Sequence, residues 1–323
     1  MNDRKRALRG VNACYLQGDY GHDLAPSPRF PDWPVSFTEM AAYRPLIEAR
    51  ELGFEAVRVW LCENAEGLVV DDGRVIGVHE DLLRAIDVLQ EAAELHGVRL
   101  YFTLLDGNAW PREQDPITRS ILADADSSQR FAEHVVRPIA ARLEPSVTLG
   151  LEIVNEPETA TSECMSPSES ELEPISWSAI GRAIKIAGDA ARSESGVLVS
   201  AGTGHVFLPS LLAAEPALDL IDIHVYHPTG GLPSRERLAE YVGDARLLDP
   251  SLPLIAGEAG IPKEDGAEES GLSNYIYNAD ELGYAAVFLW QLDGALRAGR
   301  GRERSTTSLG ELLRHTLSVT GQP

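Results

Sequence analysis

Two glutamates close apolar segments that are far apart in this 323-residue chain. Glu156 follows the stretch LGLEIVN, and Glu258 ends the stretch LIAGE. Two carboxylates in different environments can divide the work of cleaving a glycosidic bond. One stays protonated and donates its proton to the leaving oxygen, while the other stays ionised and attacks the anomeric carbon. This chemistry requires a fold that brings the two side chains to one site.

The segments that must position these glutamates alternate between strand and helix patterns. Glycines at Gly53, Gly97 and Gly283 predict helix ends shortly before the next strand. Such alternation is typical of a parallel sheet, and the short helix-to-strand joints favour a single (β/α)8 TIM barrel over an open doubly wound sheet. No break in composition divides residues 1–323, so we expect one catalytic domain. The eight predicted strands cover residues 10–16, 56–61, 100–105, 149–155, 197–201, 220–226, 254–258 and 285–290.

In such a barrel the carboxyl ends of the strands converge on one face. Strands four and seven lie across the barrel mouth from each other, so Glu156 and Glu258 are expected to meet there. Arg58 and the Tyr226 hydroxyl are placed to hold Glu258 ionised, whereas a less compensated site would leave Glu156 protonated. The ends of the predicted strands carry further polar or aromatic residues, namely Asp106, Asn155, His224 and Trp290.

These motifs resemble those of the clan A glycoside hydrolases, most closely glycoside hydrolase family 5. IVNEPE is similar to the acid/base motif of the clan, and GVN, HVYH and GEAG fall on strands where the clan has counterparts. The resemblance implies that Glu156 is the acid/base, that Glu258 is the nucleophile and that anomeric configuration is retained. It also implies Arg58 and Tyr226 as partners of the nucleophile, and Asn155, His224 and Trp290 as substrate contacts.

Three stretches bear on the sugar. VRVWLCEN, LLDGNAW and FLWQLDG look more like the mannan-hydrolysing branch, and the third strand lacks the histidine of many family 5 cellulases. We therefore expect a retaining β-glycosidase that acts on mannan or manno-oligosaccharides by double displacement, with Asn108 and Trp110 as further substrate-binding residues. A β-glucosidase or β-glucanase, a transglycosylase, and a barrel that binds carbohydrate without turnover remain alternatives.

Other residues at the strand ends have simpler interpretations. Glu152 shares the inward phase of Glu156, and a charge so deep in a barrel requires a partner, so we expect a structural ion pair. For Glu258 the alternative to a catalytic role is a structural acid paired with Arg58. For His224 the alternative to a substrate contact is a core histidine whose hydrogen bonds are satisfied within the protein. Asp106 and His227 are candidate subsite residues. The acids expected to be solvated loop charges are Glu63, Glu66, Glu158 and Asp293.

Composition excludes several functions. A net charge of −22 disfavours nucleic-acid binding, and the basic stretch at 297–305 is short and glycine-rich, as in a solvated loop. No apolar run approaches the roughly 18 residues of a membrane span. The N-terminus lacks a secretory pattern, and the three cysteines lack CxxC spacing, so we expect free thiols and a cytoplasmic location. Without HExxH or paired CxxC motifs, no metal or cofactor is expected. The oligomeric state is not predicted.

Overall fold

The computed structural model describes residues 6–16, 23–165, 172–204, 218–226, 232–260, 269–292, 296–298, 305–306 and 308–320. Its main sheet has nine parallel strands in the order β7-β6-β5-β2-β1-β11-β10-β9-β8. The strands are β1 (Leu8–Asn12), β2 (Ala56–Trp60), β5 (Arg99–Asp106), β6 (Thr148–Asn155), β7 (Leu198–Ser200), β8 (Gly202–Thr203), β9 (Ile221–Val225), β10 (Leu254–Gly260) and β11 (Ala286–Trp290).

The sheet closes nearly into a barrel. β7 and β8 lie at opposite ends of the strand order, yet only Ala201 separates them in the chain, so together they form the predicted fifth strand. The amide of Glu156 donates to the carbonyl of Gly202 at 3.0 Å and ties the end of β6 to β8. The predicted single (β/α)8 barrel is confirmed, and each of its eight strands overlaps the expected range. The first strand differs most, because it begins at Leu8 and ends at Asn12 instead of covering residues 10–16.

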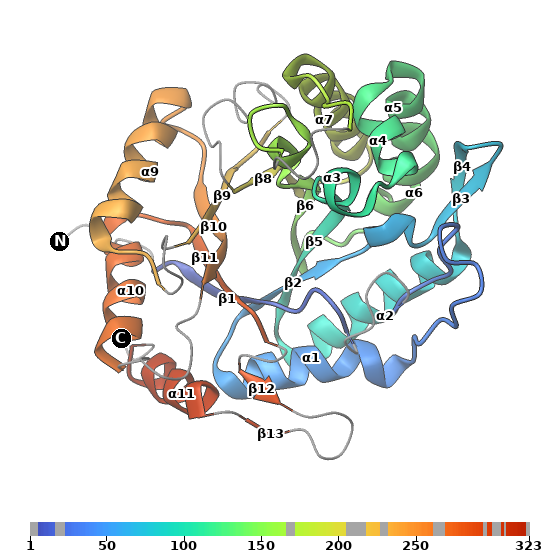
Figure 1. The fold of residues 1–323 in the computed structure, drawn as a ribbon. Coiled ribbons are helices and arrows are strands. Elements are labelled where there is room, and N and C mark those ends of the chain that lie inside the picture. The colour runs from blue at the N-terminus through green and yellow to red at the C-terminus, as the bar shows by residue number, and fades with distance from the viewer. Residues whose placement is uncertain are drawn as a thin grey trace.

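Helices surround the strands (Figure 1). Three of the described helices end at glycines with left-handed backbones, as the sequence predicts: Gly53 with φ 92°, Gly97 with φ 63° and Gly283 with φ 85°. Among the described residues, no helix combines the length and apolarity that a membrane span requires. The helices are α1 (Glu39–Leu52), α2 (Glu80–His96), α3 (Ala109–Glu113), α4 (Pro116–Ala123), α5 (Ala125–Phe131), α6 (Arg137–Ala140), α7 (Trp177–Glu194), α9 (Arg235–Leu248), α10 (Glu269–Leu282) and α11 (Ser308–Thr320).

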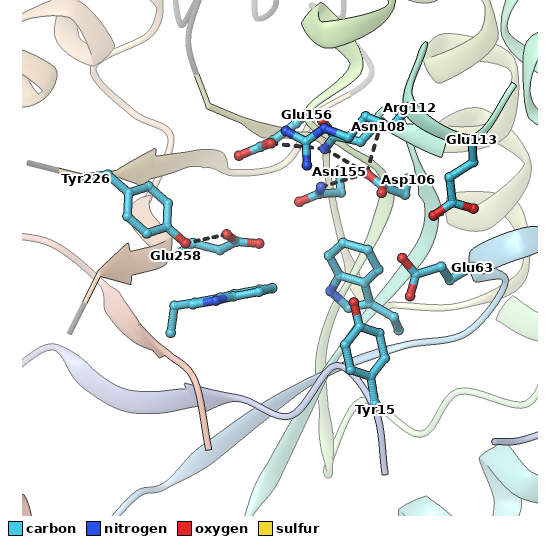
Figure 2. Close-up of a pocket in the computed structure, with 12 residues that line it drawn as sticks. Tyr15, Glu63, Asp106, Asn108, Arg112, Glu113, Asn155, Glu156, Tyr226 and Glu258 are labelled. Atoms are coloured by element: carbon cyan, nitrogen blue, oxygen red, sulfur yellow. Dashed lines mark hydrogen bonds between the residues drawn. The ribbon is translucent and has the colours of Figure 1, made fainter. Parts of the chain in front are cut away.

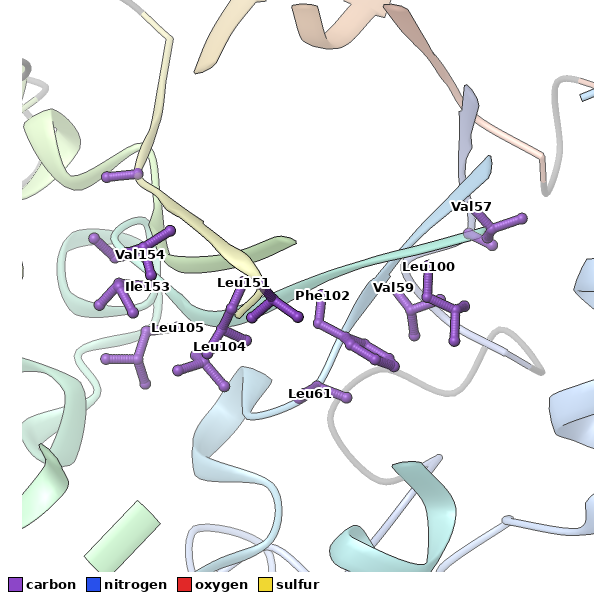
Figure 3. Packing of buried hydrophobic residues seen from close by; sticks show 14 of the residues in the cluster. Val57, Val59, Leu61, Leu100, Phe102, Leu104, Leu105, Leu151, Ile153 and Val154 are labelled. Carbon is purple, nitrogen blue, oxygen red and sulfur yellow. The ribbon is translucent and has the colours of Figure 1, made fainter. Parts of the chain in front are cut away.

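Two apolar layers support the site. One lies between strands and helices, where buried side chains of β2, β5 and β6 such as Val57, Phe102 and Leu151 pack (Figure 3). The other fills the lower barrel interior and includes Tyr101 and Phe288. Alternate residues of a strand point to opposite faces, so Val57 packs outward while its neighbour Arg58 points inward. The polar side chains above the second layer therefore come from the strand positions that point inward, such as that of Arg58.

A hairpin that the sequence analysis did not predict follows β2. Strands β3 (Leu68–Asp71) and β4 (Arg74–Val78) pair antiparallel. Asp72 and Gly73 form the turn between them, and both have positive φ, 45° and 70°. Asp-Gly between two β-branched runs is a recognised signal for such a turn, and it was available in the sequence.

Candidate active site

Glu156 follows β6 directly and begins the short helix η3 (Pro157–Ala160) with a left-handed backbone, φ 42° and ψ 52°. This conformation is uncommon for a residue with a side chain and recurs at functional sites. Gly107 makes it possible, because a Cβ at that position would lie 2.4 Å from the Glu156 carbonyl oxygen. The backbone of Glu156 is therefore held from one side by the loop after β5 and from the other by Gly202.

The Glu156 carboxylate is contacted on both oxygens. Asn108 Nδ2 donates to Oε2 at 3.1 Å, and His224 Nδ1 lies 3.0 Å from Oε1. Gly204 leaves space for this carboxylate, since a Cβ there would be 2.5 Å from Oε1. The side chain is 14% exposed, which leaves it accessible from the barrel mouth.

Glu258 projects from β10 into a different environment. Arg58 Nη1 donates to Oε1 at 2.7 Å, and the Tyr226 hydroxyl donates to Oε2 at 2.7 Å. Burial opposes the charge of Arg58, but Glu152 and Glu258 more than offset it and raise the arginine pKa. Desolvation and the Glu258 charge likewise raise the pKa of the Tyr226 phenol, so it remains a donor. The structure places both predicted partners against Glu258.

The two carboxylates lie close together. One oxygen of Glu156, one oxygen of Glu258 and a ring nitrogen of His224 are all within 4.8 Å of one another. Carboxyl groups about 5–5.5 Å apart are typical of retaining glycosidases, whereas inverting enzymes need about 6.5–9.5 Å to admit a water. The separation leaves a covalent intermediate on one glutamate geometrically feasible.

His224 lies behind this pair and does not line the cavity. Its side chain is fully buried, 3.0 Å from Glu156 and 3.7 Å from Glu258. Burial opposes a charge on the imidazole, but the Glu258 charge and the hydrogen bond and charge of Glu156 raise its pKa to about 10. The resemblance implied a substrate contact, and the structure instead places this imidazole where it bridges the two acids.

Arg58 organises the polar layer beneath the site. It donates to Glu152 through Nε at 2.8 Å and Nη2 at 3.1 Å, to Asn12 at 2.8 Å and to Asn155 Oδ1 at 2.9 Å. Glu152 also accepts from the Thr103 hydroxyl at 2.6 Å and is fully buried. The expected structural ion pair of Glu152 is therefore present, and its partner is Arg58.

The two glutamates line a cavity of about 760 Å³ (Figure 2). The rings of Trp60 and Trp290 contribute apolar surface to it, with centroids 6.5 Å apart and planes at 58°. Aromatic faces of this kind suit the apolar faces of sugar rings. The lining residues are Tyr15, Trp60, Glu63, Asp106, Asn108, Arg112, Glu113, Asn155, Glu156, Tyr226, Glu258 and Trp290.

Besides His224, the sequence predicted one more substrate-binding residue that does not line the cavity, and other lining residues were not predicted. Trp110 is not part of the lining, because its indole nitrogen donates to the Glu173 carbonyl at 3.2 Å and Arg119 covers its ring. Trp60 was missed although it shares the inward phase of Arg58, a period-two signal that the sequence carries. The other residues that were missed, Tyr15, Arg112 and Glu113, lie outside the barrel strands, where no such period exists.

The expected solvated loop acids are buried where the structure describes them. Glu66 accepts from the Ala25 amide at 2.9 Å, and burial raises its pKa. Glu158 accepts from the Gly204 amide, and Glu63 lines the cavity at 3% exposure. Loop charge alone could not reveal that these loops fold over the barrel mouth. Asp293 and His227 lie outside the described residues.

Within the described part of the chain, two groups of side chains have the ligand spacing of a metal site, and both include His224. The first adds Glu156 and Glu258, and the second adds Glu152 and Asp222. Their carboxylates already accept hydrogen bonds from protein donors, and the Arg58 guanidinium directly contacts two of them. A further cation would have to displace or face this positive charge, so the donor set fits protons better than a metal ion.

No family model matches the chain. A mannan endo-1,4-β-mannosidase of Mytilus edulis is 30% identical over 172 residues, which cover 52% of this chain and 43% of that relative. The matched segment thus spans less than half of the length of the relative.

Solved structures share the fold over nearly the whole chain. A β-1,4-mannanase of the sea hare Aplysia kurodai is 18% identical, with a TM-score of 0.71 over 99% of this chain and 93% of its own. The Mytilus edulis β-mannanase also gives 0.71 at 18% identity, over 98% and 92%. A GH5_18 protein of Streptomyces cattleya, solved with Manβ1-4GlcNAc, gives 0.69 at 16% identity, over 98% and 82%. These likenesses show that the chain shares the barrel fold of these proteins.

Proposed function

We propose that the protein is a retaining glycoside hydrolase that cleaves β-mannosidic bonds in mannan or manno-oligosaccharides by double displacement. The single observation that carries the proposal is the pair of carboxylates within 4.8 Å, each with its own set of partners. The curated relative and several similar structures are named as mannanases, which supports the sugar. We further propose that residues 1–323 act as one catalytic domain.

In the first step Glu258 attacks the anomeric carbon while Glu156 transfers its proton to the leaving oxygen. Arg58 and Tyr226 each donate a hydrogen bond to the attacking carboxylate and orient it. When the bond to carbon forms and the charge of Glu258 disappears, Arg58 keeps an anionic partner in Glu152. The cation is therefore never left uncompensated in the barrel interior, where such a charge would be costly.

In the second step a water attacks the glycosyl-enzyme, and Glu156 now takes its proton. The ionised Glu156 formed in the first step is stabilised by Asn108 and by the His224 imidazolium. Water attacks the face opposite to Glu258, so the two inversions restore the original configuration. A sugar hydroxyl in place of water would give transglycosylation by the same route.

The test is product analysis on matched β-manno- and β-gluco-oligosaccharides, with Glu258→Ala as the inactive control. Hydrolysis of the manno series alone is expected. Cleavage of the gluco series instead would show that the assigned sugar is wrong, while the proposed mechanism would stand. Binding of both series with no hydrolysis by the unsubstituted protein would overturn the enzymatic assignment in favour of a carbohydrate-binding barrel.

A further inference from the structure

Asp106 has no part in the two steps described above, although it ends β5 and lines the cavity. It is 5% exposed. Its Oδ1 accepts three hydrogen bonds: from the Asn108 backbone amide at 3.0 Å, from Asn108 Nδ2 at 3.0 Å and from Asn155 Nδ2 at 2.9 Å (Figure 2). One buried carboxylate oxygen thus holds two side-chain amides at the edge of the catalytic pair.

The orientation of an amide is decided only by its hydrogen-bond partners, because its oxygen and nitrogen ends have nearly the same shape. Asn155 is fixed at both ends, since Nδ2 donates to Asp106 and Oδ1 accepts from Arg58. Asn108 is not. Its Nδ2 donates to Asp106 and to Glu156, and among the described residues no donor reaches its buried Oδ1. The two carboxylates alone therefore determine which end of Asn108 faces the cavity.

This dependence has a consequence for proton transfer. While Glu156 is ionised, its carboxylate can only accept, so its bond with Asn108 is enough to keep Nδ2 turned toward it. When Glu156 carries its proton, its hydroxyl would bond equally well to Asn108 Oδ1 if the amide were reversed. The acid proton would then point at Asn108 instead of at the leaving oxygen. A second carboxylate that always accepts from Nδ2 prevents this reversal.

We propose that Asp106 is a positioning residue that keeps the Asn108 amide nitrogen toward Glu156 and thereby leaves the acid proton of Glu156 free for the leaving group. The proposal rests on the proposed function, because it assigns Asp106 a part in the same proton transfer. Burial raises the pKa of Asp106 to about 6, while the Asn155 and Asn108 hydrogen bonds oppose that rise. Near neutral pH the carboxylate is ionised and remains an acceptor.

A purely structural role makes a different prediction. Asp106 also accepts from the Asn108 backbone, so its loss could merely loosen the loop after β5. Such loosening would reduce activity by a similar factor on every substrate. Failure to direct the acid proton would instead depend on the leaving group, because activated aryl leaving groups need little protonation and sugars need it fully.

The experiment measures kcat/KM of Asp106→Leu and Asp106→Asn on a dinitrophenyl β-glycoside and on an unactivated oligosaccharide of the sugar that the unsubstituted protein cleaves. We expect Asp106→Leu to lose about 100-fold on the oligosaccharide and less than about 5-fold on the activated substrate. Asp106→Asn keeps an acceptor oxygen, so the same split should be smaller. If Asp106→Leu does not fold, the difference between the two substrates in Asp106→Asn tests the proposal.

Asp115→Asn is the matched control. Asp115 is also a buried aspartate, but its carboxylate caps α4, where it accepts from the Ile117 amide at 3.0 Å and from the Thr118 hydroxyl at 2.6 Å. Its loss should show no dependence on leaving group. Equal losses of the Asp106 variants on both substrates overturn the positioning role while leaving the proposed function intact. An unsubstituted protein that hydrolyses neither substrate overturns both.

Discussion

The surroundings of Glu156 and of Glu258 differ although the side chains are the same. Glu258 projects from a regular strand and accepts from a buried guanidinium and a phenol. Glu156 has a left-handed backbone and follows the end of its strand. Its carboxylate accepts from the Asn108 amide and faces the His224 imidazole. Both carboxylates therefore face a positive charge, but the two cations differ. The Arg58 guanidinium keeps its charge throughout, whereas the His224 imidazole beside Glu156 can gain and lose a proton. These neighbours favour different roles for the two acids.

The largest expected effect separates these roles directly. Glu258→Ala should lower kcat by at least about 10⁴-fold on every substrate, because no glycosyl-enzyme can form. Glu156→Ala should lose about 10²- to 10⁴-fold on oligosaccharides and much less on a dinitrophenyl glycoside. Steady-state kinetics on both substrates checks this. Equal losses by the two variants on both leaving groups would show that the roles are wrongly assigned.

The space around Glu156 provides the next test. Gly204→Ala places a Cβ 2.5 Å from Glu156 Oε1, so the carboxylate must move. A displacement of about 1 Å from the productive geometry costs about 100-fold in kcat/KM. Gly243→Ala in α9 is the matched control, since its Cβ meets nothing within 4 Å. Activity retained in Gly204→Ala would mean that the position of Glu156 is less constrained than its packing implies.

A smaller loss is expected on the Glu258 side. Tyr226→Phe removes the phenol donor to Glu258 and leaves the Arg58 donor in place. A hydrogen bond to a charged group contributes about 1.5–3 kcal/mol, so kcat/KM should fall about 10- to 100-fold. The loss should appear on activated and unactivated substrates alike, in contrast to that of Glu156→Ala. A loss confined to poor leaving groups would place Tyr226 with the acid instead of the nucleophile.

The smallest effect concerns His224, which lies between the two glutamates. Its folded-state pKa of about 10 exceeds the ordinary value of about 6.5. The stability that it contributes is therefore complete below about pH 6.5 and is lost as pH rises toward 10. Urea unfolding should show the unsubstituted protein losing at least about 1 kcal/mol more than His224→Gln over this range. Parallel pH profiles for the two proteins would contradict a charged imidazole.

The barrel and the proximity of its two strand-end glutamates could be predicted from the sequence because both depend on local patterns. Strand runs such as residues 100–105 and the glycine helix ends have fixed periods and caps, and strand order then brings Glu156 opposite Glu258. The misplacement of Trp110 and the burial of Glu66 depend instead on how irregular loops pack. No sequence period tells whether a loop residue faces the cavity, so the neighbours of such a residue are known only from the three-dimensional structure.

The role of His224 was also beyond the sequence. Its position on an inward strand phase was evident, but whether it faced the substrate or the space behind the acids depended on side-chain packing. Gly202 lies against its ring, since a Cβ there would be 2.7 Å from Nε2, and the ring reaches both carboxylates through Nδ1. Contacts of this kind join residues from β8, β9 and β10 and have no signature in any one of them.

The most direct test of the account is to trap the covalent intermediate. A 2-deoxy-2-fluoro-β-mannosyl fluoride slows both steps of a double displacement, and peptide mapping by mass spectrometry then locates the labelled residue. We expect one sugar on Glu258 and none in the Glu258→Ala variant, and proton NMR of an ordinary β-mannoside should show β-mannose as the first product. A label on Glu156, or α-mannose as the first product, would contradict the assignment of Glu258 as the nucleophile of a retaining enzyme.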